Sequence, residues 1–124
     1  MNVVDSSGWL EYLVDGPNAG FFAPAIERTK SLVVPSITLY EVFKRAYQQR
    51  DEDAAAEAIA VMLQGHVADL DVLAALSAAE VALELGLSMA DSIVLSAART
   101  YGATLWTQDA DFEGIAGVRY VARR

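Results

Sequence analysis

The chain has 124 residues, 54% of them hydrophobic, which predicts one domain with a well-supplied core and excludes a disordered protein. Nine Lys and Arg against 17 Asp and Glu give a net charge of −8, which argues against a protein that holds nucleic acid by a basic surface alone. Cysteine is absent and His66 is the one histidine, which excludes disulfides, thiolate metal sites and sites that need two imidazoles.

The first half of the chain predicts strands that alternate with helices, judged from its hydrophobic periodicity. The elements are a strand at 3–4, a short helix at 9–14 with Ser7 as candidate N-cap, a helical segment at 19–30, a strand at 32–34 ended by Pro35, and helices at 38–50 and 51–64. Pro24 lies inside the segment 19–30 and is expected to kink or divide it.

The second half continues the alternation. Its elements are a weak strand at 67–70, helices at 73–85 and 88–101 that end at Gly86 and Gly102, a strand at 103–106, a turn or short helix at 109–113, and a strand at 118–121. This order predicts an α/β fold with a central parallel sheet flanked by helices, which binds ligands at the carboxyl ends of its strands. No apolar run approaches the roughly 18 residues of a membrane span and no signal peptide is evident, so a cytoplasmic protein is expected.

Five acidic residues fall where this fold would bring them together. Asp5 ends the first strand, Asp109 and Asp111 follow the strand at 103–106, and Glu41 and Asp91 lie in the first turns of the helices at 38–50 and 88–101. Strand ends and the starts of the following helices share one edge of a parallel sheet. Carboxylates in one cleft repel each other unless they are protonated or bridged by a cation. Oxygen ligands without His or Cys suit Mg²⁺ or Mn²⁺, which can stabilise both oxygens of a displacement at a phosphodiester.

Each acid also has a purely structural interpretation. Thr38-x-x-Glu41 and Ser88-x-x-Asp91 both match the capping-box pattern. Glu41 has Lys44 and Arg45 at i+3 and i+4, as in an ordinary surface ion pair, and for this residue taken alone the structural interpretation is favoured.

The structural interpretation is weaker for Asp91 and Asp5. On a helical wheel Asp91 lies within an apolar arc, whereas the polar arc of its helix is formed by Ser92, Ser96, Arg99 and Thr100. A carboxylate beside an apolar face is costly without a partner. Asp5 follows a strand that should be buried, although it also has the option of bonding to the turn that follows it.

Four segments together resemble one family over residues 1 to about 121. They are Val-Val-Asp5-Ser-Ser, Pro-Ser-Ile-Thr-Leu-Tyr-Glu41-Val, Leu-Ser-Met-Ala-Asp91-Ser and Ala-Thr-Leu-Trp-Thr107-Gln-Asp109-Ala-Asp111. Their order and spacing resemble the PIN-domain nucleases, and most closely the toxins of bacterial VapBC toxin–antitoxin pairs. The main departure is Trp106, where the family more often has a smaller apolar residue.

The resemblance implies an endoribonuclease that depends on Mg²⁺ or Mn²⁺, leaves 5′-phosphate and 3′-hydroxyl ends, forms a homodimer and is held in check by a cognate antitoxin. By position it implies a metal-binding quartet of Asp5, Glu41, Asp91 and Asp109, with Asp111 as a less constant acid and Ser6 and Thr107 as supporting hydroxyls. Lys44 and Arg45, with Arg50 after them, are candidates to hold flanking RNA, although a solvated helix face explains them equally well.

Aromatic residues are concentrated in the first 50 positions, where seven of the eleven lie: Trp9, Tyr12, Phe21, Phe22, Tyr40, Phe43 and Tyr47. Some of them are expected to form an exposed groove for a helical antitoxin segment, and the alternative is that all are core. Two other functions compete with the ribonuclease. A receiver-like phospho-aspartate domain would need an acid pair after the first strand, and a PIN-like binding module without catalysis would not need all four acids.

Overall fold

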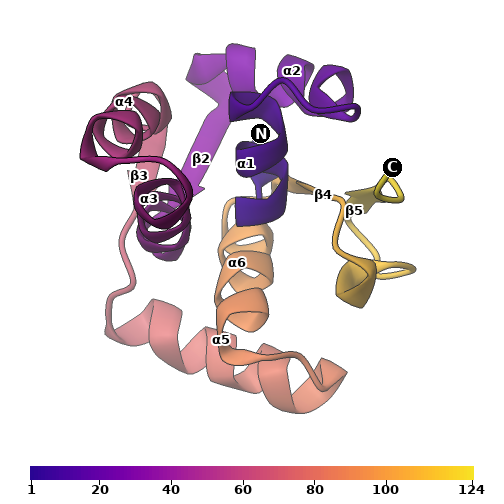
Figure 1. Ribbon diagram of the computed structural model, residues 1–124. Coiled ribbons are helices and arrows are strands. Elements are labelled where there is room, and N and C mark those ends of the chain that lie inside the picture. Colours follow the sequence, from indigo (N-terminus) through magenta and orange to yellow (C-terminus); the bar gives the residue numbers. More distant parts are fainter.

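The computed structural model describes all 124 residues, and Figure 1 shows strands and helices arranged as an α/β fold. In chain order the elements are β1 (Asn2–Val4), α1 (Ser6–Leu13), α2 (Ala19–Glu27), the 3₁₀ turn η1 (Thr29–Ser31), β2 (Leu32–Pro35), α3 (Ser36–Gln49), α4 (Glu52–Met62), β3 (His66–Ala68), α5 (Val72–Leu85), α6 (Met89–Thr100), β4 (Thr104–Thr107), the 3₁₀ turn η2 (Ala110–Phe112) and β5 (Val118–Tyr120). No single helix is long and apolar enough to cross a membrane, and α5 with α6 meets that test only as a pair bent by 111°.

The five strands form one sheet in the order β3-β2-β1-β4-β5, and every neighbouring pair is parallel. The predicted central parallel sheet is therefore confirmed. From β1 the chain builds the sheet outward through β2 and β3, and then returns to place β4 on the other side of β1. Strand order thus reverses between β1 and β4, which is where open parallel sheets bind their ligands.

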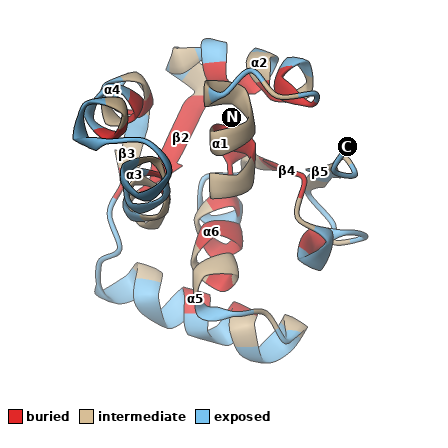
Figure 2. Ribbon diagram, in the orientation of Figure 1, coloured by how far each residue is buried: buried red, intermediate tan, exposed pale blue.

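Two hydrophobic cores lie on opposite faces of this sheet, because successive side chains of a strand point to opposite sides. Val4, Val34 and Trp106 belong to the core that also contains residues of α1 to α4. Their chain neighbours Val3, Val33 and Leu105 belong to the core that includes residues of α5 and α6. Figure 2 shows the central strands buried between these layers, whereas much of α5 is exposed.

The N-terminal part of the helical layer differs from prediction at two points. Helix α1 begins at Ser6, and its N-cap is Asp5 rather than Ser7, because Asp5 accepts a hydrogen bond from the backbone N–H of Gly8. Helix α2 runs through Pro24 and ends before Arg28, so the predicted division at Pro24 is wrong. Pro24 and Gly20 both lie on the exposed side of α2, where water can bond to the carbonyl that Pro24 leaves without a partner.

Helix α3 begins two residues earlier than predicted, at Ser36, directly after Pro35. The predicted capping box at Thr38 is therefore wrong: the Thr38 hydroxyl is buried inside the first turn and donates to the carbonyl of Pro35 at 2.6 Å. Glu41 consequently lies in the second turn of α3. Strand β3 covers 66–68 instead of 67–70, because it pairs only with the last three residues of β2.

Two glycines in neighbouring helices give a matched test of this packing. A Cβ on Gly8 would lie 2.6 Å from Cε1 of Phe22 and 2.7 Å from Cγ1 of Val4, whereas a Cβ on Gly20 would meet nothing within 4 Å. We expect Gly8→Ala to lower the free energy of unfolding by about 1–3 kcal/mol, because the core cannot accept the methyl group without shifting. Gly20→Ala should raise it by about 0.5–1 kcal/mol through helix propensity. Urea denaturation measures both free energies of unfolding. A Gly8→Ala protein with an unchanged free energy of unfolding would contradict the close approach of α1 to α2.

Candidate metal centre

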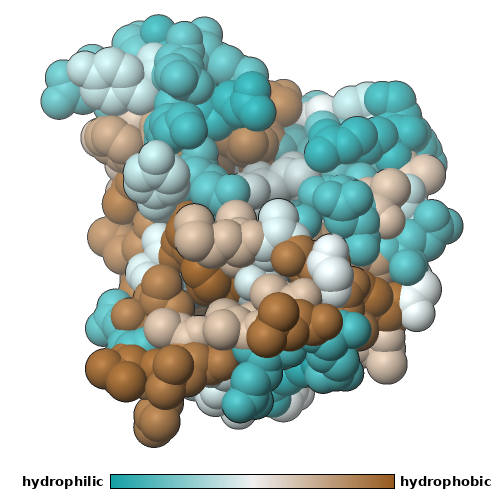
Figure 3. All heavy atoms as spheres, turned by 90° about the horizontal axis from the view of Figure 1, so that it is seen from below, coloured by the Kyte–Doolittle hydropathy of each residue, from teal (hydrophilic) through white to brown (hydrophobic).

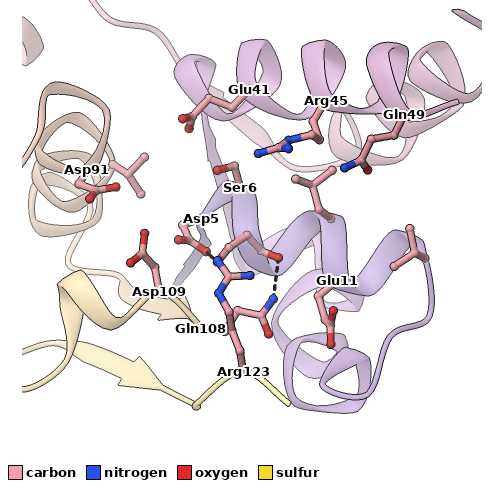
Figure 4. Close-up of a pocket in the computed structure, with 14 residues that line it drawn as sticks. Asp5, Ser6, Glu11, Glu41, Arg45, Gln49, Asp91, Gln108, Asp109 and Arg123 are labelled. Carbon is pink, nitrogen blue, oxygen red and sulfur yellow. Dashed lines mark hydrogen bonds between the residues drawn. The ribbon is translucent and has the colours of Figure 1, made fainter. Parts of the chain in front are cut away.

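The strands that flank the reversal of strand order each end in an aspartate. Asp5 follows β1 and Asp109 follows β4, and these two strands pair in parallel. Glu41 reaches toward the same place from α3 and Asp91 from the first turn of α6 (Figure 4). Four acids that are far apart in the sequence therefore face one another across the carboxyl edge of the sheet.

These acids line a cleft of about 410 Å³. Its polar lining is formed by Asp5, Ser6, Ser7, Glu11, Glu41, Arg45, Gln49, Asp91, Gln108, Asp109 and Arg123. All four members of the predicted quartet are thus in the cleft, together with Arg45 and Ser6 from the wider set. Lys44 is not, since its Nζ lies 5.6 Å from the ring centre of Tyr40 on the exposed side of α3.

Asp5 is the most deeply buried acid of the cleft, with 5% of its surface exposed. One carboxylate oxygen accepts from the Ser7 hydroxyl at 2.8 Å and from the N–H of Gly8 at 3.1 Å, and the other accepts from the Thr107 hydroxyl at 2.8 Å. Burial raises the pKa of Asp5 to about 6; these hydrogen bonds partly oppose the shift and the nearby charge of Asp109 adds to it. Asp5 is therefore held rigidly in place but lacks a positive partner.

Thr107 joins the two central acids. Its hydroxyl donates to Asp5 and accepts from the backbone N–H of Asp109 at 2.9 Å. Asp109 in turn begins η2 by accepting from the N–H of Asp111 at 3.0 Å. The Thr107 hydroxyl, predicted as a supporting group, thus fixes the turn that carries Asp109 against Asp5.

Asp91 faces the acids that follow β4. Asp91, Asp109 and Asp111 each have a carboxylate oxygen that could bind a metal ion, and these three oxygens all lie within 4.8 Å of one another. Burial raises the pKa of Asp91 to about 6, the charges of Asp109, Asp111 and Glu41 add to the increase, and a hydrogen bond with Ser88 opposes it. Asp111, which the sequence ranked below the quartet, therefore lies close enough to Asp91 and Asp109 to share an ion with them.

The structure corrects the predicted faces of α6. Ser92 and Ser96, which the helical wheel placed on a polar arc, are buried, and Asp91 is only partly exposed. The Ser92 hydroxyl can be buried because it donates to the carbonyl of Met89 at 2.8 Å. The capping interpretation is confirmed for Ser88, whose hydroxyl accepts from the N–H of Asp91 at 3.3 Å.

Glu41 lies opposite, on α3, and is partly buried. Burial raises the pKa of its carboxyl group, and the Ser6 hydroxyl and the charge of Lys44 oppose that shift. The hydroxyl that supports Asp5 thus belongs to Ser7, whereas Ser6 lies between Asp5 and Glu41 (Figure 4). Adjacent serines at the start of a helix look alike in a sequence, so this division of roles could not be read from the motif.

The donor set fits a hard divalent cation. It consists of carboxylate and hydroxyl oxygens only, which is the chemistry that Mg²⁺ and Mn²⁺ prefer. Three carboxylates have oxygens close enough to share one ion, and two acids are shifted toward protonation by burial and by each other. Uncompensated negative charge in a cleft is relieved either by protons or by cations.

Comparison with known proteins gives a consistent result. A family model described as "PIN domain" matches residues 3–118, while a comparison with curated proteins gives no match. A toxin–antitoxin complex from Klebsiella pneumoniae is similar with a TM-score of 0.77 at 22% identity, over 96% of each chain. VapC20 from Mycobacterium tuberculosis, a sarcin-ricin loop cleaving toxin, is similar with a TM-score of 0.74 at 19% identity, over 94% of this chain and 95% of that one. DNA-bound VapBC from Salmonella typhimurium gives 0.74 at 19%, over 98% and 96%. At these identities the likeness is one of fold, and it confirms the predicted architecture.

Proposed function

Because the chain belongs to the PIN-domain family, we propose that it is a metal-dependent endoribonuclease that acts as the toxin of a toxin–antitoxin pair. The observation that carries the proposal is the convergence of Asp5, Glu41, Asp91 and Asp109 on one cleft. These acids come from four separate elements, and no capping or packing role explains why all four should face the same space.

Asp91 and Asp109 are the proposed first ligands of Mg²⁺ or Mn²⁺, with Asp111 beside them and Asp5 and Glu41 completing the site. The ion would supply the charge that neutralises a phosphodiester and lowers the pKa of an attacking water. The protein's own part is to hold the carboxylates in place, which it does at Asp5 through hydrogen bonds from Thr107 and Ser7. An acidic protein can then bind RNA, since the cation links its carboxylates to the phosphates.

The decisive experiment is cleavage of RNA by the purified chain in Mn²⁺ or Mg²⁺, with sequencing of the RNA ends. We expect cleavage that EDTA abolishes, and products with 5′-phosphate and 3′-hydroxyl ends. The competing prediction is a PIN-domain binding module without catalysis. That alternative gains support if the chain binds Mn²⁺ but leaves cellular RNA intact. The family assignment removes the receiver-like signalling domain.

The proposed antitoxin site uses the exposed aromatic residues of α3. Of the seven aromatics in the first 50 positions, Trp9 and Phe22 are fully buried, whereas Tyr40, Phe43 and Tyr47 are 62%, 39% and 49% exposed. These three lie on one helix beside the cleft, which is where a partner that blocks the cleft would bind. Structures of similar proteins include toxin–antitoxin complexes, in keeping with a protein partner.

A surface separate from the aromatic residues of α3 is the candidate for the predicted homodimer contact. Helix α5 leaves large apolar side chains exposed, and Figure 3 shows them gathered on the face that carries this helix. They are Val72, Leu73, Leu76 and Leu83, with Met89 at the start of α6. Exposed apolar area of this kind marks an interaction surface. We propose a second copy of the chain as its occupant, which sedimentation of the isolated chain would test.

A further inference from the structure

Two arginines line the cleft beside the acids. Arg45 extends from α3, and Arg123 extends into the cleft from the segment after β5, between Gln108 and Asp5 (Figure 4). Asp5 takes its hydrogen bonds from Ser7, Gly8 and Thr107, and none of them comes from an arginine. The guanidinium group of Arg123 therefore faces the same space as the carboxylates without being bound to Asp5.

The backbone immediately before Arg123 is fixed on both sides. The N–H of Val121 donates to the carbonyl of Thr107 at 3.0 Å, which continues the pairing of β5 with β4. The side chain of Asn18 donates to the carbonyl of Ala122 at 3.0 Å. Asn18 is 3% exposed, so the donor of this bond is held inside the protein, while its acceptor Ala122 lies at the surface.

A second buried amide completes this support. Asn18 also donates to the side-chain oxygen of Gln108 at 3.0 Å, and Gln108 donates to the carbonyl of Ser7 at 3.4 Å. Gln108 is 5% exposed and stands between Thr107 and Asp109. The same pair of amides therefore connects the start of α1, the turn that carries Asp109 and the backbone of Ala122. Burying an amide group is unfavourable unless it forms hydrogen bonds. The hydrogen bonds of these two amides hold the cleft wall beside Arg123 in place.

A guanidinium group suits one kind of ligand in this place. It binds phosphate through two parallel N–H groups, and it cannot lose its proton at the pH of a cell. In RNA, each phosphate is separated from the next by a single nucleotide. A strand whose scissile phosphodiester faces the acids therefore presents a neighbouring phosphate to the cleft wall.

We propose that Arg123 binds a backbone phosphate adjacent to the scissile phosphodiester, and that Asn18 and Gln108 are positioning residues for it. The proposal rests on the proposed ribonuclease function and adds a substrate contact to it. Arg123 is itself exposed, so replacing it leaves the core and the acids unchanged. Arg124, the next residue, has the same charge and does not line the cleft, which makes it a matched control.

The test is the steady-state cleavage of a single-stranded RNA oligonucleotide in Mn²⁺ over a range of salt concentrations. For Arg123→Ala we expect KM to rise about tenfold while kcat changes little, as for a lost binding contact. The slope of log KM against log salt should fall by about 0.7, the value for one phosphate contact on a single strand. Arg123→Lys should recover part of the affinity but not all of it, and Arg124→Ala should match the wild-type protein.

Equal KM and equal salt slopes for Arg123→Ala and Arg124→Ala would overturn the proposal while the ribonuclease function stands. Faster cleavage by Arg123→Ala would also overturn it, because the side chain would then be blocking the cleft. A wild-type chain that cuts no RNA would overturn the proposed function itself. For the positioning residues, Asn18→Ala should raise KM in the wild-type background and add nothing in the Arg123→Ala background. Additive effects would mean that Asn18 acts on something other than Arg123.

Discussion

Replacing Asp91 with asparagine is expected to abolish RNA cleavage and, at the same time, to stabilise the metal-free protein. Loss of residues that merely support metal ligands typically costs 10–100-fold in metal affinity or activity, so loss of a ligand should lower cleavage by at least about 100-fold. The stabilisation follows because Asp91 faces the charges of Asp109, Asp111 and Glu41. Removing one charge from this group should raise the free energy of unfolding by about 1 kcal/mol at neutral pH.

A matched control separates this expectation from a helix-capping role. Asp51 is likewise an aspartate at the start of a helix. It is the N-cap of α4, where it accepts from the N–H of Ala54 at 2.8 Å, but it lies outside the cleft. Asp51→Asn should keep full cleavage and change stability by less than about 0.5 kcal/mol, because asparagine caps as well as aspartate. If Asp91 were simply part of a cap, its asparagine variant would behave like this control. Thermal melts in EDTA beside a cleavage assay compare the two variants directly.

The metal-free protein is expected to lose stability as the pH rises from about 4 to about 6. In the folded chain, burial raises the pKa of Asp5 and of Asp91 from 3.8 to about 6. Between these values the folded state binds more protons than the unfolded state, so the free energy of unfolding falls as protons are lost, and the loss is complete above the folded pKa. The expected loss is on the order of 3 kcal/mol for Asp5 and less for the more solvated Asp91.

Urea denaturation at a series of pH values, in EDTA and in Mn²⁺, measures this effect. Mn²⁺ should remove most of the loss, since a cation that binds only the folded state adds about 2.7 kcal/mol at a hundred times its dissociation constant. Asp91→Asn should flatten the EDTA curve in part, and Asp51→Asn should leave it unchanged. A metal-free protein that gains stability steadily from pH 4 to pH 7 would contradict the burial of unpaired carboxylates at this edge.

Asp5 and Asp109 were predictable because each stands at a position that topology alone defines. Val3 and Val4 are apolar on both sides of the strand, so they had to be buried, and the residue after them had to lie at the sheet edge. The same reasoning placed Asp109 after β4. A parallel sheet then brings these ends together whatever the details of the loops.

Other features depended on choices between nearly equal local alternatives. Asp5 and Ser7 are both good N-cap residues, and only the position of the Gly8 N–H relative to β1 decides between them. Ser92 looked solvent-facing because its hydroxyl is polar, yet a bond to its own helix allows burial. Arg123 carried no local signal at all, since it enters the cleft just after Ala122, which is bonded to Asn18, 104 positions earlier in the chain.

The pairing of β1 with β4 has a consequence for how the protein is made. The bond between Thr107 and Asp5 joins residues 102 positions apart, so neither half of the chain can assemble the acidic cleft by itself. Contacts of such long range form late in folding, after the loop between them has been closed. During synthesis, Asp5 leaves the ribosome first, and nearly every later element is made before Asp109 can pack beside it. The acidic cleft is therefore complete only after β4 and Asp109 have left the ribosome.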